Sequence, residues 1–242
     1  RLAATQIFLR HYAAADSAVD LAISLAPTSP HMRLLKMLVA LGRGDLAGAR
    51  AVVQAAVQRI DSTTMLAFAA TYQDLYWVLD DAQQRRVLEL PPADFDDDRA
   101  VWGLVRAEIH DLRHDSVRTA AFADSARVVV EEQVRSAPDD AQRRVLLGLT
   151  LAYLGRKAEA VREGLRGVEL LPISQDGYFG PYVQLQLVRI YLLTGEPEKA
   201  LDQLEPLLKV PFYISPGWLR IDPTFDPLRN NQRFRRLVER AS

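Results

Sequence analysis

The chain has 242 residues, of which 49% are hydrophobic and 25% are charged, a balance that is typical of globular proteins and excludes intrinsic disorder. Its 30 lysine and arginine residues nearly match its 31 aspartate and glutamate residues, so the chain lacks the basic excess of a general nucleic-acid binder. Because cysteine is absent, disulfides, thiolate metal sites and cysteine nucleophiles are all excluded.

The longest apolar stretch, residues 145–155, predicts a buried helix and not a membrane span. It has about half of the roughly 20 residues that cross a bilayer, so we expect no membrane insertion. The first ten residues break every apolar run with a polar side chain, and no signal peptide is visible. Since the chain opens at Arg1 without methionine, we expect it to be part of a longer protein.

Apolar residues recur at spacings of three and four from end to end, whereas alternation at period two is sustained nowhere, so the pattern predicts an all-helical fold. The helices predicted in the first part of the chain are 1–12, 14–27, 30–42, a return helix after the turn at Gly44-Asp45, 63–80 and 82–90. The loop 91–98 contains two prolines and an acidic cluster, and it is predicted to be an internal joint.

The second part of the chain is predicted to consist of helical hairpins. The expected helices are 99–112, 116–136, 139–154, 157–171, 182–194 and one that begins at Pro197. Gly155 and Gly195 are each placed to end the first helix of a hairpin in a left-handed conformation. Pro172 closes a second helix, and Pro197 occupies the first helical turn, which tolerates proline.

The hairpins resemble tetratricopeptide repeats, helix-turn-helix units of about 34 residues with large and small residues at fixed spacing. The residues that stand at the signature positions are Trp102, Leu147, Gly148, Leu151, Gly155, Ala160, Pro172, Leu187, Tyr191, Gly195 and Ala200. The resemblance implies an all-α superhelix, a solenoid of helical hairpins over residues 1–211. In such hairpins small residues let the two backbones nest, and large ones fill the groove to the next hairpin.

The sequence after residue 211 is more distinctive than the repeats. Its first part, residues 212–223 (FYISPGWLRIDP), resembles the C-terminal end of repeat regions attached to bacterial serine/threonine protein kinases and to some signalling cyclases and regulators. This resemblance implies a regulatory segment with a kinase domain upstream, on the cytoplasmic or the periplasmic side of a membrane-anchored signalling protein. The chain itself contains no kinase motif.

Residues 212–242 are predicted to form a cap on the last repeat, because the exposed end of a repeat stack needs a cover to stay soluble. The aromatic residues expected to provide that cover are Trp218, Phe225 and Phe234. An alternative is that the same aromatic residues form a peptide site.

Tetratricopeptide repeats hold partners on a concave face lined by the first helix of each hairpin. The resemblance places on this face Gln142, Val145, Leu149, Tyr182, Leu185, Arg189 and His110, together with Gly103 and Ala107. These residues are mixed and mainly uncharged, which favours a half-apolar peptide or helix as the partner. In the competing interpretation several of them only pack between hairpins.

His110 and His114 have the spacing of a two-histidine zinc pair on a helix. A zincin motif needs glutamate where Asp111 stands, and no third ligand is evident, so a plain inter-helix turn is the preferred interpretation. The acidic residues of 94–98 lack the glycine and glutamate of a calcium loop and are expected to cap the next helix.

The leading prediction is a non-enzymatic segment that binds a protein or peptide, without metal, cofactor or catalytic residue. Two alternatives stay open. One is a metal-dependent hydrolase that uses His110 and His114, and the other is the repeat module of a transcriptional regulator.

Overall fold

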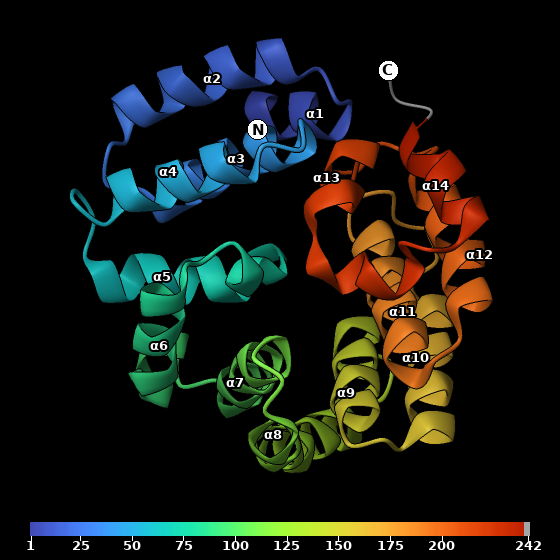
Figure 1. The fold of residues 1–242 in the computed structure, drawn as a ribbon. Helices are drawn as coiled ribbons and strands as arrows, with labels where there is room; N and C mark the ends of the chain where they lie inside the picture. The colour runs from blue at the N-terminus through green and yellow to red at the C-terminus, as the bar shows by residue number, and fades with distance from the viewer. Residues whose placement is uncertain (240–242) are drawn as a thin grey trace. The chain divides into compact units, whose positions relative to one another are not determined.

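The computed structural model describes residues 1–239, and within that range it is all-helical, with no β-strand (Figure 1). The all-α fold class predicted from the apolar spacing is therefore confirmed. The chain divides into two compact units, and the first boundary, between Asp97 and Asp98, lies at the joint predicted for residues 91–98.

The N-terminal unit comprises residues 1–97 and 211–223, together with the end of the chain from residue 236. Its helices are α1 (Leu2–Phe8), α2 (Tyr12–Leu25), α3 (Pro30–Gly42), α4 (Leu46–Ala56), α5 (Ser62–Thr71), α6 (Asp81–Glu89) and α13 (Pro216–Ile221), with 3-10 segments η1 (Tyr72–Trp77) and η2 (Pro92–Phe95).

The C-terminal unit comprises residues 98–210 and 224–235. Its helices are α7 (Arg99–Leu112), α8 (Ser116–Ser136), α9 (Ala141–Tyr153), α10 (Lys157–Leu170), α11 (Gly180–Thr194) and α12 (Pro197–Leu207). The 3-10 segment η3 (Pro223–Leu228) lies almost wholly in this unit, and α14 (Gln232–Glu239) begins in it. The predicted ranges 99–112 and 116–136 match α7 and α8 residue for residue.

Five helix pairs in the described chain are joined by the same turn. One residue of each turn has a positive φ, between 58° and 81°: Arg10, Gly44, His114, Gly155 and Gly195. The next backbone N–H donates to the carbonyl five residues before it, at 2.8–2.9 Å in every case. This six-to-one bond closes the helix end and directs the chain back along the helix it has just left. The glycine turns were predicted, whereas Arg10 and His114 carry no glycine signal.

The second helices of three pairs also end alike. Ala26, Ala137 and Leu171 close α2, α8 and α10 with φ between −138° and −136° and ψ between 68° and 76°. Each of the three precedes a proline, whose ring excludes the helical conformation from the residue before it. Pro172, which was expected to end a helix, is thus one of three prolines that follow the closing residue of a second helix in the same way.

Within the hairpin of α9 and α10 the two backbones are in close contact. A Cβ atom added to Gly148 would lie 3.0 Å from the carbonyl oxygen of Ala160 and 3.2 Å from the amide nitrogen of Gly164. One added to Gly164 would lie 2.8 Å from Ile190 Cδ1 in α11. Positions without side chains therefore let α9, α10 and α11 pack together, and one apolar core cluster extends from α7 to α11.

Most of the residues that stand at the predicted signature positions are buried. Those buried in the C-terminal unit are Leu147, Gly148, Leu151, Ala160, Leu187, Tyr191 and Ala200. Trp102 is half-buried and meets the ring of Phe122 edge-on at 5.8 Å. Gly155 and Gly195 are exposed at turns, as turn residues should be.

The helix expected over 63–80 is broken. α5 ends at Thr71, and Gln73 and Asp74 then adopt positive φ values of 60° and 55°. Neither residue type marks a break in the sequence, because the apolar spacing of three and four continues through the 3-10 segment. Leu75, Tyr76 and Trp77 are buried there.

The segment predicted to cap the last repeat is divided between the two units. Phe225 and Phe234 are buried with ring centroids 6.2 Å apart, and Arg233 bonds Glu205 and Asp202 of α12, as a cap on the last pair would require. Trp218 instead belongs to the N-terminal unit, where its ring meets Trp77 at 6.0 Å. The contact with Trp77 is one that local sequence cannot indicate, and the cap expected over residues 212–242 stays a prediction.

Nowhere in the described range does a helix combine the length and the apolar character needed to span a bilayer.

The shared turn makes a prediction at two equivalent positions. A Cβ added to Gly155 would touch nothing, so Gly155→Ala should cost only the strain of the left-handed backbone, about 1–2 kcal/mol of unfolding free energy. His114 already bears that strain at φ 58°, so His114→Gly should leave stability unchanged or raise it by up to about 1 kcal/mol. Urea unfolding followed by circular dichroism measures both, and equal stabilities for wild type and Gly155→Ala would contradict the shared turn.

Candidate functional site

Most residues predicted to line a concave partner site are buried. They lie on α7, α9 and α11, where Val145 and Leu149 are fully enclosed and Leu185, Arg189 and His110 are also buried. Gln142 alone is exposed, and Tyr182 is half-buried. Five of the seven residues are therefore buried, and the open binding face that they were expected to form stays a prediction. The first helices of the hairpins use these side chains to pack.

Arg189 is buried because it forms an ion pair with Glu108. Arg189 Nη2 lies 2.5 Å from Glu108 Oε1, and the two side chains are 6% and 2% exposed. Arg189 Nη1 also donates to Gln186 Oε1 at 2.9 Å. A charged group removed from water needs such partners, and these link α7 to α11 across the face once assigned to a ligand.

His110 and His114 do not act as a pair. The ring of His110 is buried and stacks on Phe122, with centroids 5.4 Å apart and planes 2° from parallel. Its Nδ1 lies 3.9 Å from Asp115 Oδ2, while His114 is the left-handed residue of the turn. No group of three histidine, aspartate or glutamate side chains in residues 1–239 is arranged to hold a metal ion. The geometry thus gives the hydrolase alternative no third ligand.

Phe122 also stacks on a cation. The guanidinium carbon of Arg106 lies 4.7 Å from the Trp102 ring centroid and 4.6 Å from that of Phe122. Burial lowers the pKa of Arg106 below its ordinary value. Trp102 of α7 and Phe122 of α8 therefore both make cation–π contacts with the guanidinium group of Arg106.

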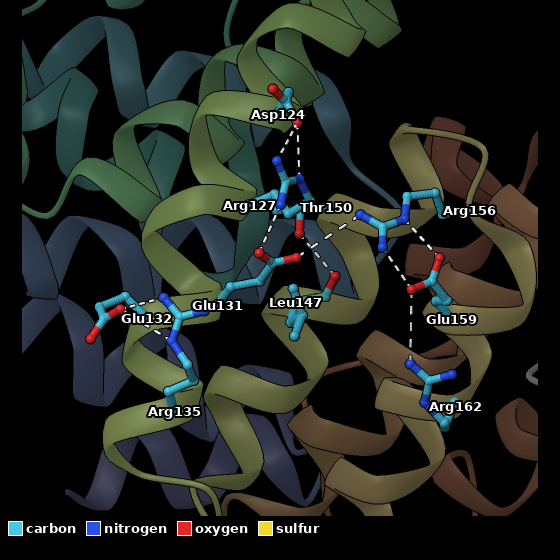
Figure 2. A network of polar contacts seen from close by, with 10 residues as sticks. All are labelled: Asp124, Arg127, Glu131, Glu132, Arg135, Leu147, Thr150, Arg156, Glu159 and Arg162. Carbon is cyan, nitrogen blue, oxygen red and sulfur yellow. Dashed lines mark hydrogen bonds and ion pairs between the residues drawn. The ribbon is translucent and has the colours of Figure 1, made fainter.

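A series of ion pairs connects the α7–α8 hairpin to the α9–α10 turn (Figure 2). Arg127 Nη1 bonds Glu131 at 2.7 Å, Arg156 lies 3.9 Å from Glu131, and Arg156 bonds both oxygens of Glu159 at 2.7 and 2.6 Å. Hydrogen bonding to Arg156 lowers the pKa of Glu159. The charges alternate and balance, so this surface carries no excess that would attract an anion or a cation.

An open cleft of about 420 Å³ lies beside α10. It is lined by Arg144, Arg162, Glu163, Leu165, Arg166 and Glu169. Arg144 bonds Glu163 at 2.7 Å, and Arg166 lies 3.1 Å from Asp139. Because the arginines already have carboxylate partners, the cleft is not a ready anion site.

The sequence reasoning missed an exposed aromatic pair. Tyr178 and Phe179, in the loop before α11, are 58% and 47% exposed, and their rings meet edge-on at 4.9 Å. The carboxylate of Asp176 accepts the backbone N–H groups of both residues at 2.8 Å, which fixes the loop. The signal that marks it is Asp176-Gly177, a turn dipeptide placed directly before two aromatic residues.

No protein-family model matches this chain, and no curated protein is significantly similar to it.

We expect the buried ion pair between Arg189 and Glu108 to have a large effect on stability, which a double-mutant cycle can measure. Arg189→Met or Glu108→Leu alone should lower the unfolding free energy by about 3–5 kcal/mol, because each leaves a buried charge without its partner. The double variant should lose much less than the sum. Arg127→Met, which removes a surface pair, should cost about 1 kcal/mol or less. Additive losses in urea unfolding would show that the two charges do not interact.

His110 predicts a pH dependence of stability. Burial lowers the pKa of His110, an effect that Asp115 partly offsets and that Arg118, Arg106 and Arg113 reinforce. The unfolded chain then binds the proton more tightly than the folded one. The contribution of His110 to the unfolding free energy is therefore fully present above the ordinary histidine pKa of about 6.5, and it is lost as the pH falls below that value.

His110→Phe keeps a ring to stack on Phe122 and should flatten the unfolding free energy between pH 7.5 and 5.5, by up to about 1.4 kcal/mol per pH unit. His31→Gln, at an exposed position, is the control and should follow wild type. If His110→Phe instead follows wild type over this range, the titrating group is elsewhere.

Proposed function

We propose that this chain is an array of tetratricopeptide-like repeats that binds a protein or peptide and catalyses no reaction. The observation that carries the proposal is the turn that recurs at Arg10, Gly44, His114, Gly155 and Gly195 with one conformation and one hydrogen bond. The first two of these residues are 34 positions apart, the length of a tetratricopeptide repeat, and the last two are 40 apart. In this proposal successive hairpins stack into a superhelix.

The proposal places the chain in a bacterial signalling protein, as the C-terminal repeat segment that follows a kinase or a related catalytic domain. It rests on the resemblance of residues 212–223 to the ends of such segments. A binding role suits a chain whose ion pairs are balanced and whose buried histidine has no metal-like surroundings, since neither feature supports chemistry.

The binding surface proposed here is the loop that presents Tyr178 and Phe179. Aromatic side chains held in fixed positions lose little entropy on binding and dominate many protein interfaces. Asp176 supplies that rigidity. Tyr182 follows within the first turn of α11 and is half-buried, so it is the residue of the earlier prediction that stays closest to this surface.

To test the proposal, a partner is first recovered with the wild-type chain, and its affinity for the chain is then measured with both components purified. Tyr178→Ser/Phe179→Ser should weaken binding at least tenfold, about 1.4 kcal/mol, with little change in melting temperature because both side chains are exposed.

Val117→Ser/Val128→Ser is the matched control, since these residues are 78% and 56% exposed on α8. It should bind like wild type. Equal affinity for all three chains would reject the aromatic loop as the binding surface, and turnover of a substrate by the pure chain would reject the proposed function.

A further inference from the structure

A short stretch of the C-terminal region is built into the N-terminal unit. Residues 211–223 belong to that unit, although the residues on both sides, Val210 and Thr224, belong to the C-terminal unit. These thirteen residues, here named the strap, contact the first two helix pairs at their turns. The contacts resemble those of a bound peptide more than those of a continuing helix array.

Two sets of hydrogen bonds hold the strap by its main chain. The N–H of Phe212 donates to the carbonyl of Phe8 at 3.0 Å. The guanidinium of Arg10 donates from Nε and Nη2 to the carbonyl of Ile214, at 3.2 and 3.0 Å. Arg10 is the left-handed residue of the α1–α2 turn, so the turn itself presents this donor.

Ser215 and Gly217 fit against the α3–α4 turn, the first through its hydroxyl group and the second because it has no side chain. Ser215 Oγ donates to the carbonyl of Gly42 at 2.6 Å and accepts the N–H of Trp218 at 3.0 Å. A Cβ at Gly217 would lie 2.6 Å from the Gly42 carbonyl oxygen and 2.9 Å from the Gly44 nitrogen. Since backbone atoms cannot yield, only glycine fits at this point of the strap.

Trp218 anchors the strap. It is 1% exposed, meets Trp77 edge-on at 6.0 Å, and lies 5.1 Å from the ring of Tyr213. Its indole Nε1 donates to Asp222 at 2.8 Å, so the buried ring leaves no unpaired donor. Main-chain bonds that give affinity and pockets that select side chains are the two parts of a peptide-recognition site.

We propose that the turn edge of the N-terminal unit is a binding site for a peptide with two aromatic residues followed by Ile-Ser-Pro-Gly-Trp, and that a second copy of this chain can fill it with its own strap. Residues 1–97 are joined to the C-terminal unit by one peptide bond, between Asp97 and Asp98. The same contacts can therefore form with a strap from either copy.

The joint favours such an exchange. Asp96 and Asp97, next to that bond, have positive φ values of 56° and 57°, a conformation that is costly for residues with a Cβ atom. An extended joint relieves this strain. The strap of the same chain has the advantage of high effective concentration, so exchange requires prior opening and becomes frequent at high protein concentration.

Complementation between two defective chains tests the proposal. One chain carries Arg10→Glu, which spoils the site and keeps an intact strap. The other carries Gly217→Leu, which spoils the strap and keeps an intact site. Each is unfolded and refolded, alone or mixed, at one total concentration, and the products are weighed by native mass spectrometry.

The mixture should contain at least ten times more dimer than either variant alone, and the dimer should hold one chain of each kind. The proposal would be overturned if both chains regain helical circular dichroism and yet form no heterodimer. It would also be overturned if each variant alone forms as much dimer as the mixture does. If a variant fails to refold, Arg10→Met and Ser215→Ala replace the pair under the same two outcomes. Only the purified chain is used, so failure here leaves the proposed partner-binding function unaffected.

Discussion

The close approach of paired helices, at positions with no room for a side chain, is the constraint on which the C-terminal unit depends. Gly148 lies on the backbone of α10, Gly164 receives Ile190 and Leu187 of α11, and Gly103 faces Ala126 across the α7–α8 pair. Helices that meet this closely exclude water along their whole contact and gain dispersion energy from many atom pairs. The shared turn then has only to reverse the chain in the space available, and it does so with one left-handed residue and one hydrogen bond.

The same tight packing restricts where a partner can bind. Val145, Leu149 and Arg189 are buried between helices. A helix face whose side chains are buried in this way exposes few groups that a ligand could contact. A partner of the proposed kind would then meet loops and turn edges, where side chains remain exposed or backbone groups accept further bonds. The rigid aromatic loop at Tyr178 and the strap on the turns of the N-terminal unit are two examples, one apolar and exposed, the other already occupied by the chain itself.

Local pattern was enough to predict the helices and their pairing. Apolar residues spaced by three and four, closed by Gly155 and Gly195 or by Pro172, fix α9 to α12 because each signal acts within a few residues of its effect. Three features were beyond local pattern. The left-handed turn at His114 carries no glycine, the break at Gln73 lies inside an unbroken apolar spacing, and Trp218 is held by Trp77, 141 positions earlier in the chain. The burial of Arg189 depends likewise on Glu108, a partner on another helix. The burial of most residues predicted for a concave face could not be foreseen for this reason, since the sequence does not tell whether a residue on the inner helix face meets a ligand or its own chain.

Nuclear Overhauser effects across the α9–α10 pair test the central claim most directly. A Cβ added to Gly148 would lie 3.2 Å from the amide nitrogen of Gly164. The α protons of Gly148 should therefore show strong cross-peaks to the Gly164 amide proton. Equivalent peaks should join Gly103 to Ala126, whose amide nitrogen also lies 3.2 Å from the corresponding position. Assigned, helical resonances at these residues without any cross-peak between them would contradict the nested helical pairs, and with them the proposed repeat array.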